Sequence, residues 1–133
     1  MAIKQPLKGL KIVLDIDGTV FYHRYPKLGD PLPGWEYIKG WVDDGAILNI
    51  STMRSNVALT QALDGLDKLG IPYAGVSKDT GQEKWTSSPK CYGHIIVDDT
   101  CCGIPLGIDS HGRDFVLLDQ VDKLIRNKFS NKM

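Results

Sequence analysis

The sequence predicts an α/β domain in which a mostly parallel, five-stranded sheet lies between helices. Short apolar and β-branched runs alternate along the chain with longer segments whose apolar residues recur at helical spacing. This alternation is typical of parallel sheets, because neighbouring parallel strands need a long crossover that is usually a helix. The chain has 133 residues, of which 42% are hydrophobic, and this length suits one core. We therefore expect a single domain over residues 1–133.

Five segments have the composition of strands. The first, residues 11–15, is apolar and β-branched on both faces, as expected for a strand in the middle of a sheet. Residues 46–51 have the sequence AILNIS, and residues 94–97 have the sequence HIIV. A shorter candidate covers residues 72–76, and residues 113–118 form the fifth. Together these five segments would make up the predicted sheet.

Three segments are predicted to be helices. The first follows Pro33–Gly34 and ends at Gly45. Its apolar residues, which fall at helical spacing, are Trp35, Ile38, Trp41 and Val42. The second covers residues 55–69, and the third runs from Asp119, as its N-cap, to about Asn127. Each helix therefore has an apolar face that can pack on the sheet.

The remaining long segments are predicted to be irregular. Residues 19–32 contain two prolines, a glycine and several polar side chains, which are typical of a loop or flap. Residues 77–89 are polar throughout and are expected to form a second loop. Neither segment has the periodic apolar pattern of a helix or strand.

The overall charge and the cysteines exclude several classes of protein. The 16 Lys and Arg residues balance the 16 Asp and Glu residues, so no net field favours nucleic acid or an anionic membrane. The N-terminus is charged, and no apolar run approaches the roughly 20 residues of a membrane span. Three cysteines, Cys91, Cys101 and Cys102, include one adjacent pair and no CxxC motif. We expect reduced thiols, no zinc site, no membrane partner and a cytoplasmic location.

Polar residues follow three of the predicted strands. Asp15 and Asp17 come after the first strand, and Asp98 and Asp99 come after the strand HIIV. The second strand is followed by a third polar group, which consists of Ser51, Thr52 and Arg54. Because the carboxyl ends of parallel strands lie at the same edge of a sheet, these three groups should converge. The sequence therefore predicts a polar site at this edge.

Four carboxylates at one place require a compensating charge. Their mutual repulsion would raise their pKa values, and a hard divalent cation such as Mg²⁺ would relieve it. Mg²⁺ takes about six oxygen ligands and usually keeps several waters. A turn at Gly18 would allow Asp17 to offer its backbone carbonyl while its side chain points elsewhere. A magnesium site is therefore the expected use of these acids.

These residues also carry a family resemblance. DIDGT, residues 15–19, resembles motif I, DxDGT, of the haloacid dehalogenase-like phosphohydrolase superfamily. Thr52-Met53-Arg54 is similar to the Ser/Thr-x-Arg motif II, and Asp98-Asp99 resembles the acidic motif IV. Lys90 lies eight residues before Asp98, at the place of the motif III lysine. Residues 25–54 and the segment HGRDFV are also similar to small capless members, so the resemblance covers nearly the whole chain and implies a Rossmann-like fold without a cap.

The resemblance implies a role for each residue of the site. Asp15 would be the nucleophile, and Asp17 would be the general acid and then the general base. Lys90 would offset the charge of the phosphoryl group. The substrate-binding residues would be Ser51, Thr52, Met53 and Arg54, and the Mg²⁺ ligands would be Asp15, Asp17, Asp98 and Asp99.

Several of these assignments have alternatives. The motif II hydroxyl could belong to Ser51 or Thr52, although the spacing to Arg54 favours Thr52. Lys78 and Lys84 also precede the last acids, so Lys90 is selected by spacing alone, and either Asp98 or Asp99 could be the direct metal ligand. Thr52 could instead cap the second helix, and Arg54 could pair with a surface acid. His23 and Arg24 in the flap could contact substrate or lie in a solvated loop.

The missing cap affects the expected substrate. Residues 19–32 are too short for a helical cap, and residues 55–90 are filled by one helix, one short strand and one loop. The site should therefore be open, and it could accept a small phosphorylated molecule, with homo-oligomerisation supplying a lid, or an exposed phosphate on a larger molecule. The predicted function is a Mg²⁺-dependent phosphatase of phosphomonoesters. The alternatives are a polynucleotide end phosphatase, with nucleic acid a less favoured partner, and a non-catalytic, receiver-like module that binds phosphate.

Overall fold

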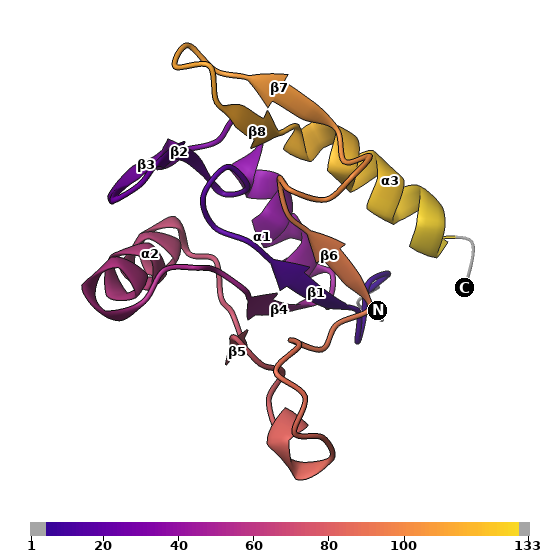
Figure 1. The fold of residues 1–133 in the computed structure, drawn as a ribbon. Helices are drawn as coiled ribbons and strands as arrows, with labels where there is room; N and C mark the ends of the chain where they lie inside the picture. The colour runs from indigo at the N-terminus through magenta and orange to yellow at the C-terminus, as the bar shows by residue number, and fades with distance from the viewer. Residues whose placement is uncertain (1–4, 131–133) are drawn as a thin grey trace.

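The structure, a computed structural model, describes residues 5–130, so the expected domain limits at residues 1 and 133 lie outside this range. Its central sheet has four parallel strands in the order β5-β4-β1-β6. These strands are β1 (Lys11–Leu14), β4 (Ile47–Ile50), β5 (Gly75–Val76) and β6 (Ile95–Val97). The predicted α/β class and the parallel sheet are confirmed, with strands shorter than the apolar runs suggested (Figure 1).

The structure has three α-helices: α1 (Trp35–Asp43), α2 (Asn56–Leu69) and α3 (Leu118–Ser130). Buried residues of all three helices form one cluster with the strand residues Ile12 and Leu14, whereas Val13 points to the other face and lies outside that cluster. The side-chain alternation of a strand explains this division. The predicted helices therefore exist, and they share a single apolar core.

The opposite face of the sheet is contacted by residues 77–93. Asn49 on this face donates to the Asp79 carboxylate and to the Tyr92 carbonyl. Gly93 lies so close to Val13 that a Cβ on this glycine would stand 2.5 Å from a Val13 methyl carbon. The segment contains a 3-10 turn, η1 (Gln82–Lys84), in place of the helical crossover expected between parallel strands. A polar, largely irregular segment thus contacts the face where a helix was expected.

The prediction of five strands in the sheet was wrong. The expected fifth segment contains β8 (Asp114–Val116), but β8 pairs antiparallel with β7 (Leu106–Ile108) in a separate sheet. The turn between them is stabilised locally, because Asp109 Oδ1 accepts hydrogen bonds from the backbone N–H groups of His111 and Arg113. A short hairpin of this kind loses less loop-closure entropy than a distant parallel pairing.

The expected flap at residues 19–32 is also more ordered than predicted. It forms the hairpin β2 (Phe21–Arg24) and β3 (Lys27–Pro31). Contacts from distant residues hold this hairpin, since the Tyr22 ring meets the Phe115 ring edge-on at 5.5 Å and Arg24 forms an ion pair with Asp109. The two hairpins therefore lie side by side above the carboxyl edge of the sheet (Figure 1).

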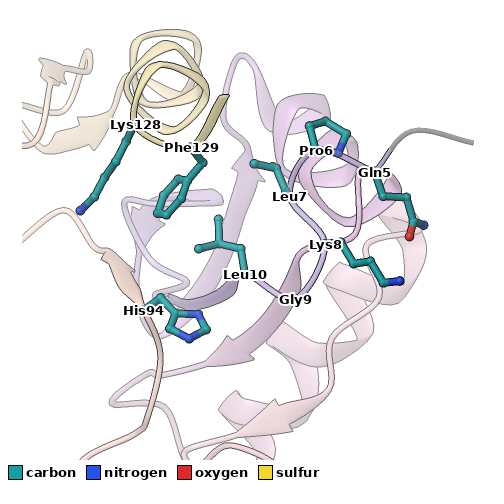
Figure 2. A pocket seen from close by; sticks show the side chains of 9 residues that line it. All are labelled: Gln5, Pro6, Leu7, Lys8, Gly9, Leu10, His94, Lys128 and Phe129. Carbon is teal, nitrogen blue, oxygen red and sulfur yellow. The ribbon is translucent and has the colours of Figure 1, made fainter. Parts of the chain in front are cut away.

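None of the helices within residues 5–130 is both long enough and apolar enough to cross a membrane. Figure 2 shows a pocket of about 580 Å³ near the amino end of β1, between the segment Gln5–Leu10, His94 and the end of α3. The described residues that line it include no carboxylate. This pocket lies at the opposite end of the strands from Asp15 and Asp98, because His94 bonds the backbone of Lys11, where β1 begins.

Candidate active site

Three strands end at the same edge of the sheet and bring the polar groups together. The backbone N–H of Asp15 donates to the Val97 carbonyl at 3.0 Å, and that of Ser51 donates to the Leu14 carbonyl at 2.9 Å. These bonds continue the ladders one residue past the strands, so Asp15 lies between the ends of β4 and β6. The predicted convergence of the polar groups at this edge is confirmed.

Three carboxylates form the centre of this site, which we call the acid cluster: Asp15, Asp98 and Asp99. Each offers an oxygen, and these atoms all lie within 4.8 Å of one another. Thr19 links two members of the cluster. Its buried hydroxyl donates to Asp15 Oδ2 at 3.0 Å and accepts from the Asp99 N–H at 3.1 Å. No role for Thr19 was predicted from the sequence, although its place in the DIDGT segment was the available signal.

Gly18 provides the space for this arrangement. Its φ of 81° lies in the left-handed region that favours glycine. A Cβ at this position would stand 2.5 Å from Asp99 Oδ2, closer than real side chains approach. The glycine therefore allows the chain to turn after Asp17 while Asp99 stays next to Asp15.

The acid cluster lacks a compensating charge. Burial is the main cause that raises the pKa of Asp15 to about 8, and the charge of Asp98 and the neighbouring Asp99 carboxyl raise it further. The pKa of Asp99 is raised as well, chiefly by burial. Within residues 5–130, no lysine or arginine forms an ion pair with these three carboxylates. The cluster therefore suits a cation that the protein itself does not supply.

Mg²⁺ fits the chemistry of this donor set. Hard divalent cations prefer carboxylate oxygens, and Mg²⁺ binds through one to a few of them while keeping water and phosphate ligands. The side chains of Asp15, Asp98 and Asp99 would hold it. One oxygen of Asp98 already accepts hydrogen bonds from the N–H and hydroxyl of Thr100, so its other oxygen is the freer one. Whether Asp98 or Asp99 is the direct ligand stays open.

The Asp17 side chain does not join the acid cluster. Arg54 donates from Nε to Asp17 Oδ2 at 2.7 Å and from its terminal nitrogen to Oδ1 at 2.8 Å. The Arg54 side chain is only 1% exposed, and its remaining donors reach backbone carbonyls of Pro26, Lys27 and Ala58. Arg54 therefore pairs with Asp17 of the DIDGT segment rather than with a surface acid or open solvent.

This pairing has a chemical consequence for Asp17. Both of its oxygens are engaged as acceptors by the same guanidinium. Asp17 would have to release one oxygen from Arg54 before it could carry a proton to a leaving group. The expected role of the Asp17 carbonyl as a metal ligand stays a prediction, and it is compatible with a side chain that points to Arg54.

The loop after β4 contains Ser51, Thr52 and Met53. The Thr52 hydroxyl accepts from the Arg54 backbone N–H at 3.1 Å, so its own proton is free to be donated. It does not cap α2, whose N-cap is Ser55. Met53 is 98% exposed at the mouth of the site. Both Ser51 and Thr52 lie next to the end of β4, and the choice between their hydroxyls stays open.

Lys90 is not brought to the acid cluster. It is exposed, and its carbonyl accepts from Gln82 in the segment that covers the sheet face. The chain then passes His94, beside the start of β1, so Lys90 comes before the amino end of β6. Lys78 instead follows β5, next to Ser77, whose N–H donates to the Ile50 carbonyl at the carboxyl edge. Spacing in the sequence could not distinguish these two lysines.

The comparisons with known proteins agree with the fold. No protein-family model and no curated protein matches the chain. The chain is similar to a solved structure of a conserved protein from Bacteroides thetaiotaomicron, with 25% identity and a TM-score of 0.74. The similarity covers 90% of this chain and 91% of that one. The similarity of fold therefore extends over nearly the whole of both chains.

Proposed function

We propose that the protein is a Mg²⁺-dependent phosphatase of the small, capless, haloacid dehalogenase-like type. It would hydrolyse phosphomonoesters through an aspartyl-phosphate on Asp15. The observation that carries this proposal is the uncompensated acid cluster at the carboxyl edge of the sheet, with Asp15 at its centre. Open α/β sheets bind ligands at this edge, so the position and the chemistry support the same function.

The hydrogen bonds of Asp15 indicate which oxygen would attack. Thr19 donates to Oδ2, and we assign the attack on phosphorus to Oδ1. A bound Mg²⁺ would supply positive charge that keeps Asp15 ionised and neutralises the phosphoryl oxygens. Asp15 Oδ1 would form a bond to phosphorus as the bond to the leaving oxygen breaks. Water would then attack the same phosphorus and release phosphate, which restores the Asp15 carboxylate.

Asp17 would move the protons of both steps. The leaving oxygen takes a proton from Asp17, and Asp17 takes one back from the attacking water. Because Arg54 binds both Asp17 oxygens here, this role requires a rotation of Asp17 away from at least one of them. Substrate binding beside Asp17 is the event that could drive the rotation, since Asp17 lines an adjoining pocket.

Lys78 is the lysine that we assign to the phosphoryl group. It follows β5 at the carboxyl edge and is exposed, whereas Lys90 precedes β6 at the other edge. A long flexible ammonium that starts at this edge can reach a phosphate held between Asp15 and Thr52. This assignment replaces the one based on spacing.

One alternative has an observation in its favour. The Asp17–Arg54 ion pair occupies the acid/base group, and an aspartyl-phosphate beside an occupied Asp17 would hydrolyse slowly. A receiver-like module would use Asp15 in this way as a phosphate-carrying switch. Such a module would keep its phosphoryl group for much longer than a phosphatase needs to complete one catalytic cycle.

The test is hydrolysis of a generic aryl phosphate by the wild type with Mg²⁺, by the wild type with EDTA, and by Asp15→Asn. We expect turnover only in the first case. Asp64→Asn, which removes an exposed carboxylate on α2, is the matched control and should keep full activity. Mg²⁺-dependent labelling of Asp15 without turnover would support the receiver-like module, and activity that survives both EDTA and Asp15→Asn would contradict both functions.

A further inference from the structure

A second pocket adjoins the acid cluster. It has a volume of about 330 Å³ and is lined by Asp17, His23, Tyr25, Met53 and Arg54. These residues come from the turn after β1, the β2–β3 hairpin and the loop after β4. We call this hollow the hairpin pocket. Since Asp17 would protonate the leaving oxygen, the group attached to that oxygen would extend into the hairpin pocket.

The one permanently charged cation among the residues that line the hairpin pocket is not free for a second anionic group. This cation is Arg54, whose guanidinium is already bound to both oxygens of Asp17 and to three backbone carbonyls. Asp17 itself adds negative charge. A carboxylate or a second phosphate on the leaving group would therefore lose water without gaining a cationic partner, which costs free energy.

Two large side chains give the hairpin pocket an apolar surface. Met53 is 98% exposed, and the Tyr25 ring is 57% exposed while lying over the Arg54 guanidinium at 5.2 Å. Neither side chain belongs to the buried apolar core, so packing within the fold does not explain why these two residues are large and apolar. A thioether and an aromatic ring make favourable contacts with an aromatic ligand, and the arginine under Tyr25 holds that ring in place.

His23 also lines the hairpin pocket and carries an unpaired polar atom. Within residues 5–130, its Nδ1 is the buried side-chain nitrogen or oxygen that has no hydrogen-bond partner. Buried polar atoms are rarely left unpaired, because an unmade hydrogen bond costs free energy. The imidazole can therefore accept or donate one hydrogen bond without requiring charge on the ligand.

From these groups we infer that the hairpin pocket is a subsite for an uncharged, aromatic leaving group. The inference rests on the proposed phosphatase function and deepens it, because it names the substrate class: monoesters of uncharged aromatic or benzylic alcohols. Sugar phosphates have no aromatic ring to offer Tyr25 and Met53. Leaving groups that carry a further anion would meet Asp17 without a free cation.

Two pairs of substrates test this inference. Benzyl phosphate and ethyl phosphate both release an alkoxide but differ in the aromatic ring. Phenyl phosphate and 3-carboxyphenyl phosphate share the ring but differ by one negative charge. We expect the wild type to have a higher kcat/KM for benzyl than for ethyl phosphate, and for phenyl than for 3-carboxyphenyl phosphate.

Variants locate the preference in the hairpin pocket. Met53→Ser should reduce the benzyl/ethyl ratio by about three- to tenfold, the size of one aromatic contact. Tyr25→Ser should do the same, with thermal unfolding measured to show that the hairpin is intact. Matched controls are Leu124→Ser on α3 and Tyr37→Ser on α1, which remove exposed apolar side chains elsewhere and should leave the ratio unchanged.

The possible outcomes distinguish a failure of the leaving-group subsite from a failure of the phosphatase function. Turnover of all four esters with equal kcat/KM, or ratios unaffected by Met53→Ser and Tyr25→Ser, would overturn the leaving-group subsite and leave the phosphatase function standing. Absence of Mg²⁺-dependent turnover on every ester would reject the phosphatase function, and this inference with it.

Discussion

Asp15 and Asp79 are two partly or fully buried acids beside the same sheet, and they differ in what surrounds them. Asp79 is 5% exposed, and its oxygens accept from the Lys11 ammonium and the Asn49 amide. Burial alone would raise the pKa of Asp79, but these hydrogen bonds outweigh it and lower the pKa. Burial raises the pKa of Asp15 to about 8, and its neighbours are two further acids.

The comparison separates an acid that stabilises the fold from one that is available for chemistry. The charge of Asp79 is neutralised within the chain, so its site needs nothing from solution. Asp15 has only a threonine hydroxyl as a side-chain donor and depends on a cation from solution to remain ionised at neutral pH. Strongly perturbed acids at a sheet edge are candidates for function for this reason. The predictions below test the difference between these two acids.

The largest expected effect is the loss of activity in Asp15→Asn. The amide cannot act as the nucleophile, so Mg²⁺-dependent kcat/KM for an aryl phosphate should fall by at least about 10⁴-fold. Asp79→Asn should retain activity within about threefold, measured at a temperature where the variant is folded, because Asp79 lies on the covered face of the sheet. Equal losses in the two variants would show that the comparison does not separate function from stability.

The second effect concerns Lys78 and Lys90, which lie toward opposite ends of the parallel strands. Removing a cation that stabilises the transferring phosphoryl group typically costs about 10²–10³-fold in kcat. Lys78→Ala should show a loss of this size, and Lys90→Ala, its matched control, should not. Steady-state kinetics on one aryl phosphate measures both. The opposite result would favour the spacing-based assignment of Lys90 and require that loop to move.

The third effect is on stability. Asp79→Asn leaves the Lys11 ammonium without its carboxylate and should lower the free energy of unfolding by about 1–3 kcal/mol, as measured by urea titration. Asp15→Asn should not destabilise the metal-free protein, because the neutral amide avoids the cost of burying a carboxylate at this position, where burial raises the pKa of Asp15 to about 8. A destabilised Asp15→Asn with an unaffected Asp79→Asn would contradict the assignment of structural and functional acids.

A fourth effect is a pH dependence of stability in EDTA. The ordinary pKa of Asp15 is 3.8 and its folded value is about 8, so the folded protein binds more protons than the unfolded chain between these values. Stability of the metal-free protein should therefore fall as pH rises from about 5 to 8. We expect thermal unfolding to show this slope, and Mg²⁺ or Asp15→Asn to flatten it. A slope of the same size in Asp15→Asn would assign it to other groups.

Local patterns in the sequence were sufficient to predict the parallel strands and the helices. The run KIVL and the strand HIIV are apolar enough to indicate burial, and the acids that follow them could then be placed at one edge by topology. The order of these elements also predicted that Asp15, Asp98 and Asp99 would meet. Local composition and the rules of parallel sheets are sufficient for these features.

The β2–β3 hairpin depends on contacts that no local pattern reveals. The β2–β3 segment is polar and contains prolines, yet Arg54 binds the carbonyls of its turn from a distance of more than 25 positions in the chain. The Asp17–Arg54 pair and the position of Lys78 are also long-range properties of the fold. The turn that separates β7 from β8 did have a local signal, since Asp109 and Gly112 are typical turn residues.

The most direct test of the central claim is to find the phosphoryl group on Asp15. Wild-type protein would be mixed with an aryl phosphate and Mg²⁺, quenched in acid within one turnover, and mapped by mass spectrometry of its peptides. We predict a phosphorylated Asp15 in the presence of Mg²⁺ and none in EDTA. Turnover with no phosphoryl group on Asp15 at any time point, or with one on a different residue, would contradict the account.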